Sequence, residues 1–207
     1  MAFGGWPPEA ISFYEGLEAD NSKSYWTSHK AVYTEKVLRP MEELAELLAP
    51  EFGEPKLFRP YRDIRFSPDK TPYKTHIGAR IGDVGYVQFS ADGLAAGAGM
   101  WHMEPPRLAR YRAAVADDGR GVELSDIVAA LEKAGIEIHG HEVLKSAPRG
   151  YPVDHPRIGL LRYKGLTSWQ RWPPEPWLHS ASAADQVVSF LRASADLCSW
   201  LTANAGE

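Results

Sequence analysis

Residues 76–101 read HIGARIGDVGYVQFSADGLAAGAGMW and contain three short runs separated by turn residues. In the first run, apolar residues alternate with small or polar ones over residues 77–81, which is typical of a strand with one buried face. Asp92-Gly93 is the strongest signal for a two-residue hairpin turn in the chain. Because such turns join antiparallel neighbours, the stretch predicts an antiparallel meander and not a parallel sheet with crossover helices.

Helical patterns flank this meander on both sides. Apolar residues recur at three- and four-residue spacing over residues 23–48, 104–116, 125–135 and 182–202. Pro40 removes one backbone donor inside the first of these segments and predicts that the helix is kinked or split in two there. The pattern therefore predicts an α+β fold, in which an antiparallel β-meander is packed with N-terminal, central and C-terminal helices.

The chain of 207 residues shows no internal repeat and no convincing linker, so it predicts a single domain, 1–207. Its expected parts are a helical N-terminal part (1–50), a basic loop and meander (58–101), two helices (104–135), returning strands (136–165) and a C-terminal helix (182–203). Smaller features are also expected: loops at 50–57 and 117–121, a helix cap at Ser125, a strand over 157–164, and a short helix opened by Pro173-Pro174.

Composition excludes several classes of protein. The formal net charge is -4, which argues against a general nucleic-acid binder but leaves a local basic groove open. No apolar run approaches about 20 residues and the start lacks a signal-peptide pattern, so we expect no membrane span and a cytoplasmic location. The single cysteine, Cys198, lies in an apolar helical pattern and predicts a buried, inert thiol. No phosphate-cradling loop or dinucleotide fingerprint is present, so no cofactor is predicted.

The stretch before the meander, residues 58–76, is locally basic. Its cations are Arg59, Arg62, Arg65, Lys70 and Lys74, and its carboxylates are Asp63 and Asp69. Three prolines stiffen it, because each fixes its own φ and restricts the residue before it. Cations held on a stiff frame predict a receptor for an anion, since little conformational freedom is lost when the ligand binds.

A structural interpretation of the same stretch stays open. Residues 61–66 have the composition of a short strand with which the meander would begin, and the Ser67-Pro68 pair would end it. On that strand Asp63 and Arg65 share a face and can pair directly, so the arginines would only pin strand ends to carboxylates. Trp26 and His29, in the preceding helix, are the residues of that helix that could face this stretch.

A second basic block lies about 90 residues further on and has the same design, with cations on a proline-stiffened loop. It contains Lys145, Arg149, His155, Arg162 and Lys164. Two such loops predict the walls of one cleft, in which arginines bind phosphate or carboxylate. The predicted anion-binding residues are Arg62, Arg65, Lys70, Lys74, Arg149, Arg162 and Lys164. The alternative is an unrelated surface loop with solvated charges.

Three residues are candidates for catalysis: His155, His76 and Asp63. A histidine is the side chain best suited to titrate near neutrality, so a hydrolase acting on an anionic substrate with a histidine general base is the second functional hypothesis. Arginines 62 and 65 would then stabilise developing negative charge. The His139-Gly-His141 pair is compatible with a metal, but no third ligand has a telling spacing, so no metal is predicted.

The third hypothesis is a non-enzymatic module that binds a partner through exposed tryptophans, namely Trp169, Trp172 and Trp177. The first choice among the three remains a cytosolic protein of unknown activity with a basic, proline-stiffened cleft for an anionic small molecule or polymer. Nucleic acid is an improbable partner and no membrane is expected, while the sequence leaves the oligomeric state and the question of catalysis open.

Three sequence blocks together resemble a known family. The blocks are Tyr61–Lys74, the segment Phe13–Leu17 followed by Asn21, Trp26 and Tyr33, and the segment Pro148–Pro156 followed by Leu160–Lys164. They resemble the uncharacterised conserved-hypothetical family catalogued as domain of unknown function 2461, over nearly the whole chain. Pro152 departs from the pattern, because a polar or acidic residue is expected there. The resemblance implies one continuous fold and brings no established activity.

Overall fold

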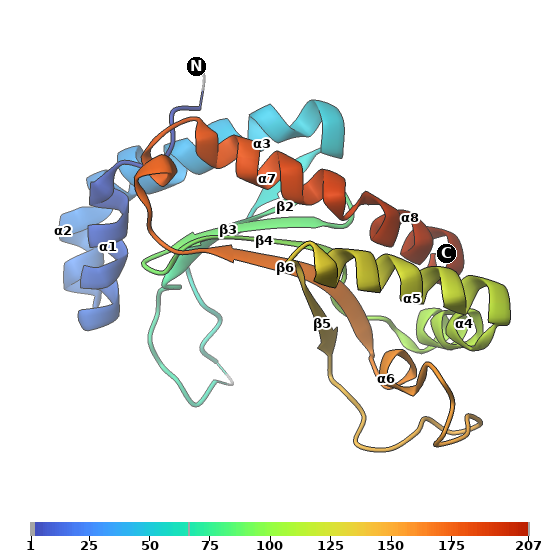
Figure 1. Cartoon of the computed structure of the whole chain (residues 1–207). Helices are drawn as coiled ribbons and strands as arrows, with labels where there is room; N and C mark the ends of the chain where they lie inside the picture. The colour runs from blue at the N-terminus through green and yellow to red at the C-terminus, as the bar shows by residue number, and fades with distance from the viewer. Residues whose placement is uncertain (1–2, 66, 207) are drawn as a thin grey trace. The chain divides into compact units, whose positions relative to one another are not determined.

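The computed structural model describes residues 3–65 and 67–206, and Figure 1 shows the arrangement of their helices and strands. The elements are α1 (Pro8–Ala19), α2 (Lys23–Val32), the π-helical segment η1 (Tyr33–Leu38), α3 (Arg39–Phe52), β1 (Pro55–Leu57), β2 (His76–Ile81), β3 (Gly85–Ser90), β4 (Gly93–Met100), α4 (Pro105–Ala116), α5 (Asp118–Lys133), β5 (Glu137–His141), α6 (Ile158–Leu161), β6 (Gly165–Trp172), the 3₁₀ helix η2 (Pro176–His179), α7 (Ser182–Ala193) and α8 (Ala195–Ala205).

The strands form a six-stranded sheet in the order β1-β2-β3-β4-β6-β5. The predicted meander is confirmed for β2, β3 and β4, which are consecutive neighbours in this order. β2 and β3 pair antiparallel with Ile77 opposite Phe89, and both side chains are buried. Gly93 begins β4 with φ +100°, a left-handed conformation that favours glycine in the turn after Asp92. The predicted α+β class is therefore confirmed.

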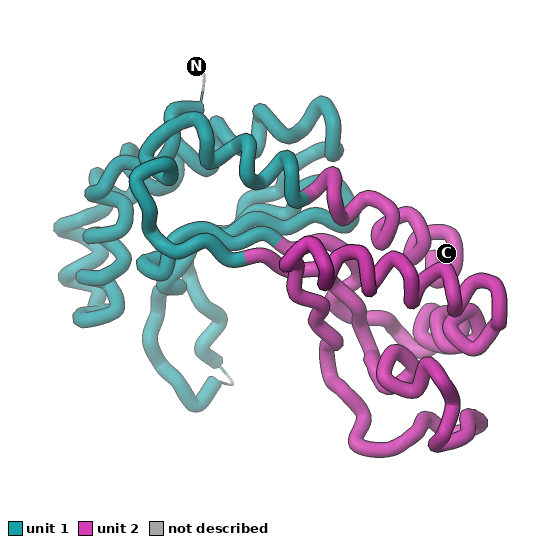
Figure 2. The backbone as a smooth tube through the Cα atoms, viewed as in Figure 1, with its two compact units in different colours: residues 1–96, 171–190 teal, residues 97–170, 191–207 magenta. Residues whose placement is uncertain are grey.

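The chain divides into two compact units (Figure 2): unit 1 comprises residues 1–96 and 171–190, and unit 2 comprises residues 97–170 and 191–207. Each unit takes segments from two parts of the sequence. That the two act as one domain, 1–207, stays a prediction.

In unit 1, the predicted helix over residues 23–48 is confirmed as the continuous run α2–η1–α3. The irregularity expected near Pro40 is the π-helical segment η1, which ends two residues before the proline. The loop predicted at 50–57 is wrong, because α3 continues to Phe52 and β1 follows at Pro55. Pro50 lies in the last turn of α3. The buried side chains of Leu44 and Leu48 hold this helix in place.

The core of unit 1 is centred on Trp6, which is fully buried. Its ring stacks on Phe89 with 4.6 Å between centroids, and its Nε1 donates to the carbonyl of Val37 at 3.3 Å. α3 packs against β1 and β2. This core fixes the two strands between which the basic stretch runs.

Unit 2 is built on α4, which packs against α5, α6 and α8, while α5 also packs against β5. The loop predicted at 117–121 and the cap predicted at Ser125 are wrong. Asp117 caps α5 instead, because its carboxylate accepts from the backbone N–H of Gly119 at 3.1 Å and of Arg120 at 2.9 Å. Ser125 lies inside the helix and donates to the carbonyl of Gly121.

The strand predicted over residues 157–164 is also wrong, since this segment forms the short helix α6 and the turn after it. Tyr111 donates through its hydroxyl to the carbonyl of Leu160 at 3.0 Å, and Arg112 donates through Nε to that of Leu161 at 3.1 Å. These side chains accordingly satisfy carbonyls at the end of α6. The alternation of residues in the sequence does not reveal such hydrogen bonds.

The C-terminal helix is confirmed in extent but is split at Ser194 into α7 and α8. Ser194 is buried, and its hydroxyl accepts from Ser168 at 2.8 Å. The short helix predicted after Pro173-Pro174 is confirmed as η2, although it starts at Pro176.

Candidate functional site

The described residues of the basic stretch, 58–65 and 67–75, form an irregular loop, which extends away from the strands of unit 1 (Figure 1). The strand predicted over residues 61–66 is wrong for the part described, and Phe66 lies outside the described residues. Tyr61 and Tyr73 form an isolated bridge, and the backbone N–H of Lys74 donates to Pro60 at 2.8 Å. Because proline has no backbone N–H, the two arms of the loop, before and after its tip, can form few backbone hydrogen bonds with each other. Their described residues therefore form no continuous ladder.

Asn21, in the link between α1 and α2, and Trp26 of α2 clamp the base of this loop. The side-chain amide of Asn21 donates to the carbonyl of Tyr73 at 3.1 Å and accepts from its N–H at 3.0 Å, as a neighbouring strand would. Trp26 stacks on the Tyr73 ring with 4.4 Å between centroids and 7° between planes, and its ring lies 5.9 Å from that of Tyr61. The expectation that Trp26 faces the basic stretch is thus confirmed, whereas His29 stacks on Tyr25.

Within the loop, Arg62 pairs with Asp69 and also donates to the hydroxyl of Thr71. Asp69 accepts from the backbone N–H of Thr71 at 2.9 Å. This backbone hydrogen bond and the Arg62 guanidinium lower the pKa of Asp69 to about 2. The three residues therefore form a charged network that holds the tip of the loop in one shape.

Asp63 and Arg65 pair as the structural interpretation requires. Arg65 donates to the two carboxylate oxygens through Nε at 2.9 Å and Nη2 at 2.7 Å, and these bonds hold the pKa of Asp63 below its usual value. Lys70 donates to the carbonyl of Ile64 at 2.9 Å, and the Lys74 ammonium lies over the Phe58 ring at 5.5 Å. A carboxylate held ionised by an arginine is a poor general base, which argues against catalysis by Asp63.

His76 begins β2 and is half-buried. Its pKa is lowered, first by burial and second by the Lys74 ammonium. On acidification the unfolded chain therefore binds this proton before the folded chain does, so the contribution of His76 to stability falls as the pH drops below about 6.5.

We expect His76→Gln to make the free energy of unfolding less dependent on pH between pH 7 and pH 5. The free energy of unfolding of the parent should decrease from pH 7 to pH 5, and the decrease should be smaller in the variant because one proton uptake is removed. Urea unfolding at pH 5, 6 and 7 measures both slopes. Equal slopes for the two proteins would show that His76 titrates alike in the folded and unfolded states.

The second basic block lies wholly in unit 2, and its cations have different surroundings. Arg149 is exposed, and Lys164 donates through Nζ to Glu142 at 2.6 Å, which lowers the pKa of that carboxyl. Nε of Arg162 is buried and has no hydrogen-bond partner among the described residues. The shared cleft of the two blocks stays a prediction.

His155 serves the local backbone. Its Nδ1 accepts from the N–H of Arg157 at 3.0 Å, and its carbonyl accepts from the N–H of Ile158 at the start of α6. Because Nδ1 already accepts, the neutral ring carries its proton on Nε2 and offers no lone pair there. The geometry therefore assigns His155 to shaping a turn and weakens the hypothesis that it is a general base.

The structure brings together a cluster in unit 2 that the sequence pattern missed. His102 follows β4, His141 ends β5 and Glu142 comes next, and one ligand atom from each lies within 4.8 Å of the others. His139, the expected companion of His141, instead forms a hydrogen bond between its Nε2 and Oε2 of Glu137, at 2.7 Å. The only signal for the cluster in the sequence is that histidines stand at the ends of two strands.

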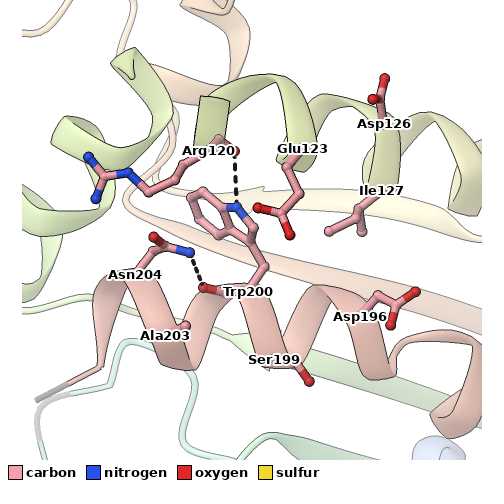
Figure 3. A pocket seen from close by; sticks show the side chains of 9 residues that line it. All are labelled: Arg120, Glu123, Asp126, Ile127, Asp196, Ser199, Trp200, Ala203 and Asn204. Carbon is pink, nitrogen blue, oxygen red and sulfur yellow. Dashed lines mark hydrogen bonds between the residues drawn. The ribbon is translucent and has the colours of Figure 1, made fainter. Parts of the chain in front are cut away.

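A groove between α5 and α8 in unit 2 was not predicted either (Figure 3). It has a volume of about 860 Å³ and its charged or polar lining consists of Arg120, Glu123, Asp126, Asp196, Ser199 and Asn204. Trp200 is buried at its floor and donates through Nε1 to the carbonyl of Arg120 at 3.0 Å. With three carboxylates and one guanidinium, this groove does not suit an anion.

Other side chains that the sequence singles out are less accessible than expected. The three predicted anchor tryptophans, Trp169, Trp172 and Trp177, are all half-buried, so their expected exposure is wrong. Trp101, in contrast, is 61% exposed. Burial raises the pKa of the Cys198 thiol to about 11, which agrees with an inert cysteine. Among the described helices, none has the length and apolar character that a bilayer span needs.

These features define a class of α+β protein with an antiparallel sheet and a basic loop clamped at its base. The chain belongs to the family described as conserved hypothetical protein (DUF2461), whose model matches residues 9–200. No curated protein matches the chain.

One solved structure that the chain is similar to is a conserved hypothetical protein from Pyrococcus furiosus, at 13% identity and a TM-score of 0.39. The match covers 82% of this chain and 95% of that one. A likeness at this level adds nothing to the functional argument.

Proposed function

We propose that the protein binds an anionic ligand, bearing phosphate or carboxylate, through the basic loop of unit 1. The observation that carries this proposal is the charge left after internal pairing. Residues 59–75 contain five cations and two carboxylates, so 5 − 2 leaves three positive charges on a protein whose net charge is -4. Such an excess on one loop attracts anions.

The pairs inside the loop support the proposal, because they hold cations in place without consuming them. The Arg65 side chain is 77% exposed, and its pair with Asp63 uses Nε and Nη2 but not Nη1. Exposed ion pairs contribute only about 0–1 kcal/mol, so a phosphate can compete for the guanidinium. The clamp by Asn21 and Trp26 and the Arg62–Asp69 pair limit the entropy lost on binding.

A second element of the same kind is proposed in unit 2. The buried Nε of Arg162 has no described acceptor, and a buried donor without an acceptor costs about 1–3 kcal/mol, so an anion or a water there would be favoured. Arg149, exposed on the segment between β5 and α6, is proposed as the second cation of this element.

Thermal melts with inorganic phosphate, phosphorylated metabolites, nucleotides and short oligonucleotides test the proposal. A ligand that binds only the folded state adds about 2.7 kcal/mol at a hundredfold excess over Kd, so some of these should raise the Tm. We expect Arg65→Ala and Arg62→Ala to reduce the rise, and added salt to weaken it.

Arg39→Ala is a matched control, because Arg39 is also in unit 1 and pairs with Glu43 at 3.3 Å outside the loop. It should keep the full response. If no anion raises the Tm, or if the loop variants respond like Arg39→Ala, the loop arginines are structural. The cytoplasmic location belongs to this proposal, and no catalytic step does.

A further inference from the structure

We propose that His102, His141 and Glu142 form a binding site for a divalent transition metal ion such as Zn²⁺. One nitrogen from each imidazole and one carboxylate oxygen lie within 4.8 Å of one another. Two histidines and one carboxylate are a donor set that zinc uses in sites with an open fourth position. The proposal is separate from the anion-binding loop, since all three residues belong to unit 2.

Backbone hydrogen bonds fix the frame that carries these ligands. The N–H of Met103 donates to the carbonyl of Lys164 at 2.9 Å, and the N–H of Lys164 donates to the carbonyl of His141 at 3.0 Å. Three segments far apart in the sequence are thereby joined in a row. His102 and His141 stand on the two outer segments, so main-chain hydrogen bonds set the distance between their backbones.

The conformation of Glu142 provides an independent sign of a built site. Its φ is 45°, and among the described residues it is the one non-glycine residue with a positive φ. Such a conformation costs of order 1–3 kcal/mol and is concentrated at functional sites. Here it accompanies a carboxylate whose Oε1 lies 3.6 Å from Nε2 of His141.

Neighbouring side chains orient two of the ligands. Lys164 holds Oε2 of Glu142 at 2.6 Å and leaves Oε1 facing His141, as an outer hydrogen bond does for a metal-binding carboxylate. The centroid of the Trp101 ring lies 4.5 Å from that of the His141 ring, so Trp101 covers one side of this imidazole. The rings of His102 and His141 are 5.9 Å apart and nearly perpendicular, at 80°, so they do not stack on each other.

Only a small adjustment is needed to bind the ion. Ligand atoms around tetrahedral zinc are about 3.4 Å apart, so atoms that lie within 4.8 Å of one another must draw together by at most about 1.4 Å. The side chains of His102 and Glu142 are 44% and 51% exposed and can rotate, while the better-packed His141 provides the fixed point. Imidazole and carboxylate together suit zinc, nickel, copper and cobalt better than magnesium or calcium.

Isothermal titration of the chelator-treated full chain with Zn²⁺ tests the inference. We expect one equivalent to bind, and His102→Ala, His141→Ala and Glu142→Gln each to weaken binding by roughly tenfold or more. His139→Ala is the matched control: His139 is two residues from His141 on the same strand but is bonded to Glu137. It should bind Zn²⁺ as the parent does.

Co²⁺ offers a second readout, because its visible absorption intensifies when the ion enters a four-coordinate site. That band should appear in the parent and in His139→Ala and be absent in His102→Ala. Circular dichroism shows which variants remain folded, and Glu142→Gln keeps the shape of the side chain. The inference is overturned if folded parent protein binds no Zn²⁺, or if His139→Ala loses binding while His102→Ala retains it.

Discussion

Replacement of Trp26 by alanine is expected to lower the free energy of unfolding by about 3–5 kcal/mol. The side chain is 5% exposed and packs against Tyr73, Tyr33 and Phe13. Its removal leaves a cavity beneath the basic loop and takes away the stacking partner of Tyr73. Denaturant unfolding measures the loss of stability, and Trp26→Phe should recover part of it because an aromatic ring returns.

Trp6→Ala distinguishes a loosened loop from a weakened core. Trp6 is fully buried in the same unit, but it stacks on Phe89, and no ring contact joins it to the described residues of the loop. Both variants should be strongly destabilised. Brief trypsin treatment in native buffer should cut Trp26→Ala first within residues 59–75, whereas Trp6→Ala should be cut there no sooner than elsewhere in unit 1. If the two cleavage maps agree, Trp26 does not clamp the loop.

The parts of the fold that depend on local sequence rules could be predicted. The alternation over residues 77–81 and the turn at Asp92-Gly93 specify the meander, because the buried face and the turn type depend on residues close in sequence. The long N-terminal helix is likewise specified by its apolar spacing, and Pro40 marks the irregularity beside it.

Other local assignments failed where a distant side chain decided the outcome. The residues of α6 alternate like a strand, but Tyr111 and Arg112 from α4 satisfy the carbonyls at its end. The strand expected over residues 61–66 has suitable side chains, but its described part, residues 61–65, pairs only through the isolated Tyr61–Tyr73 bridge. A strand requires a ladder, and the prolines of the loop remove part of it.

The candidate site divides in the same way. The cations of the basic loop can be counted in the sequence, and the Asp63–Arg65 pair follows from their spacing of two residues. The clamp of Tyr73 by Asn21 joins residues 52 positions apart, and no periodic pattern reports such a contact. The cluster of His102, His141 and Glu142 was missed for the same reason, since tertiary structure alone brings its strands' ends together.

Gly165→Ala is expected to have the second large effect, in unit 2. Gly165 begins β6, and a Cβ there would lie 1.9 Å from the carbonyl oxygen of Trp101 and 2.5 Å from its carbonyl carbon. Backbone atoms cannot rotate aside as a flexible side chain can, so the segment at Trp101 must move. Overpacking of this kind costs about 1–3 kcal/mol and sometimes more.

The same substitution also tests the frame of the proposed metal site, because His102 is the next residue after Trp101. We expect Gly165→Ala to lower the free energy of unfolding and also to weaken Zn²⁺ binding, although it removes no ligand atom. Gly159→Ala is the control: apart from its chain neighbours and the backbone of its own helix, no described atom lies within 4 Å of the added Cβ, and within α6 alanine should stabilise by at most about 1 kcal/mol. Its Zn²⁺ affinity should be unchanged. Equal stability of the two alanine variants would mean that Gly165 does not meet the Trp101 backbone, and a destabilised Gly165→Ala with full Zn²⁺ affinity would mean that this contact does not position His102.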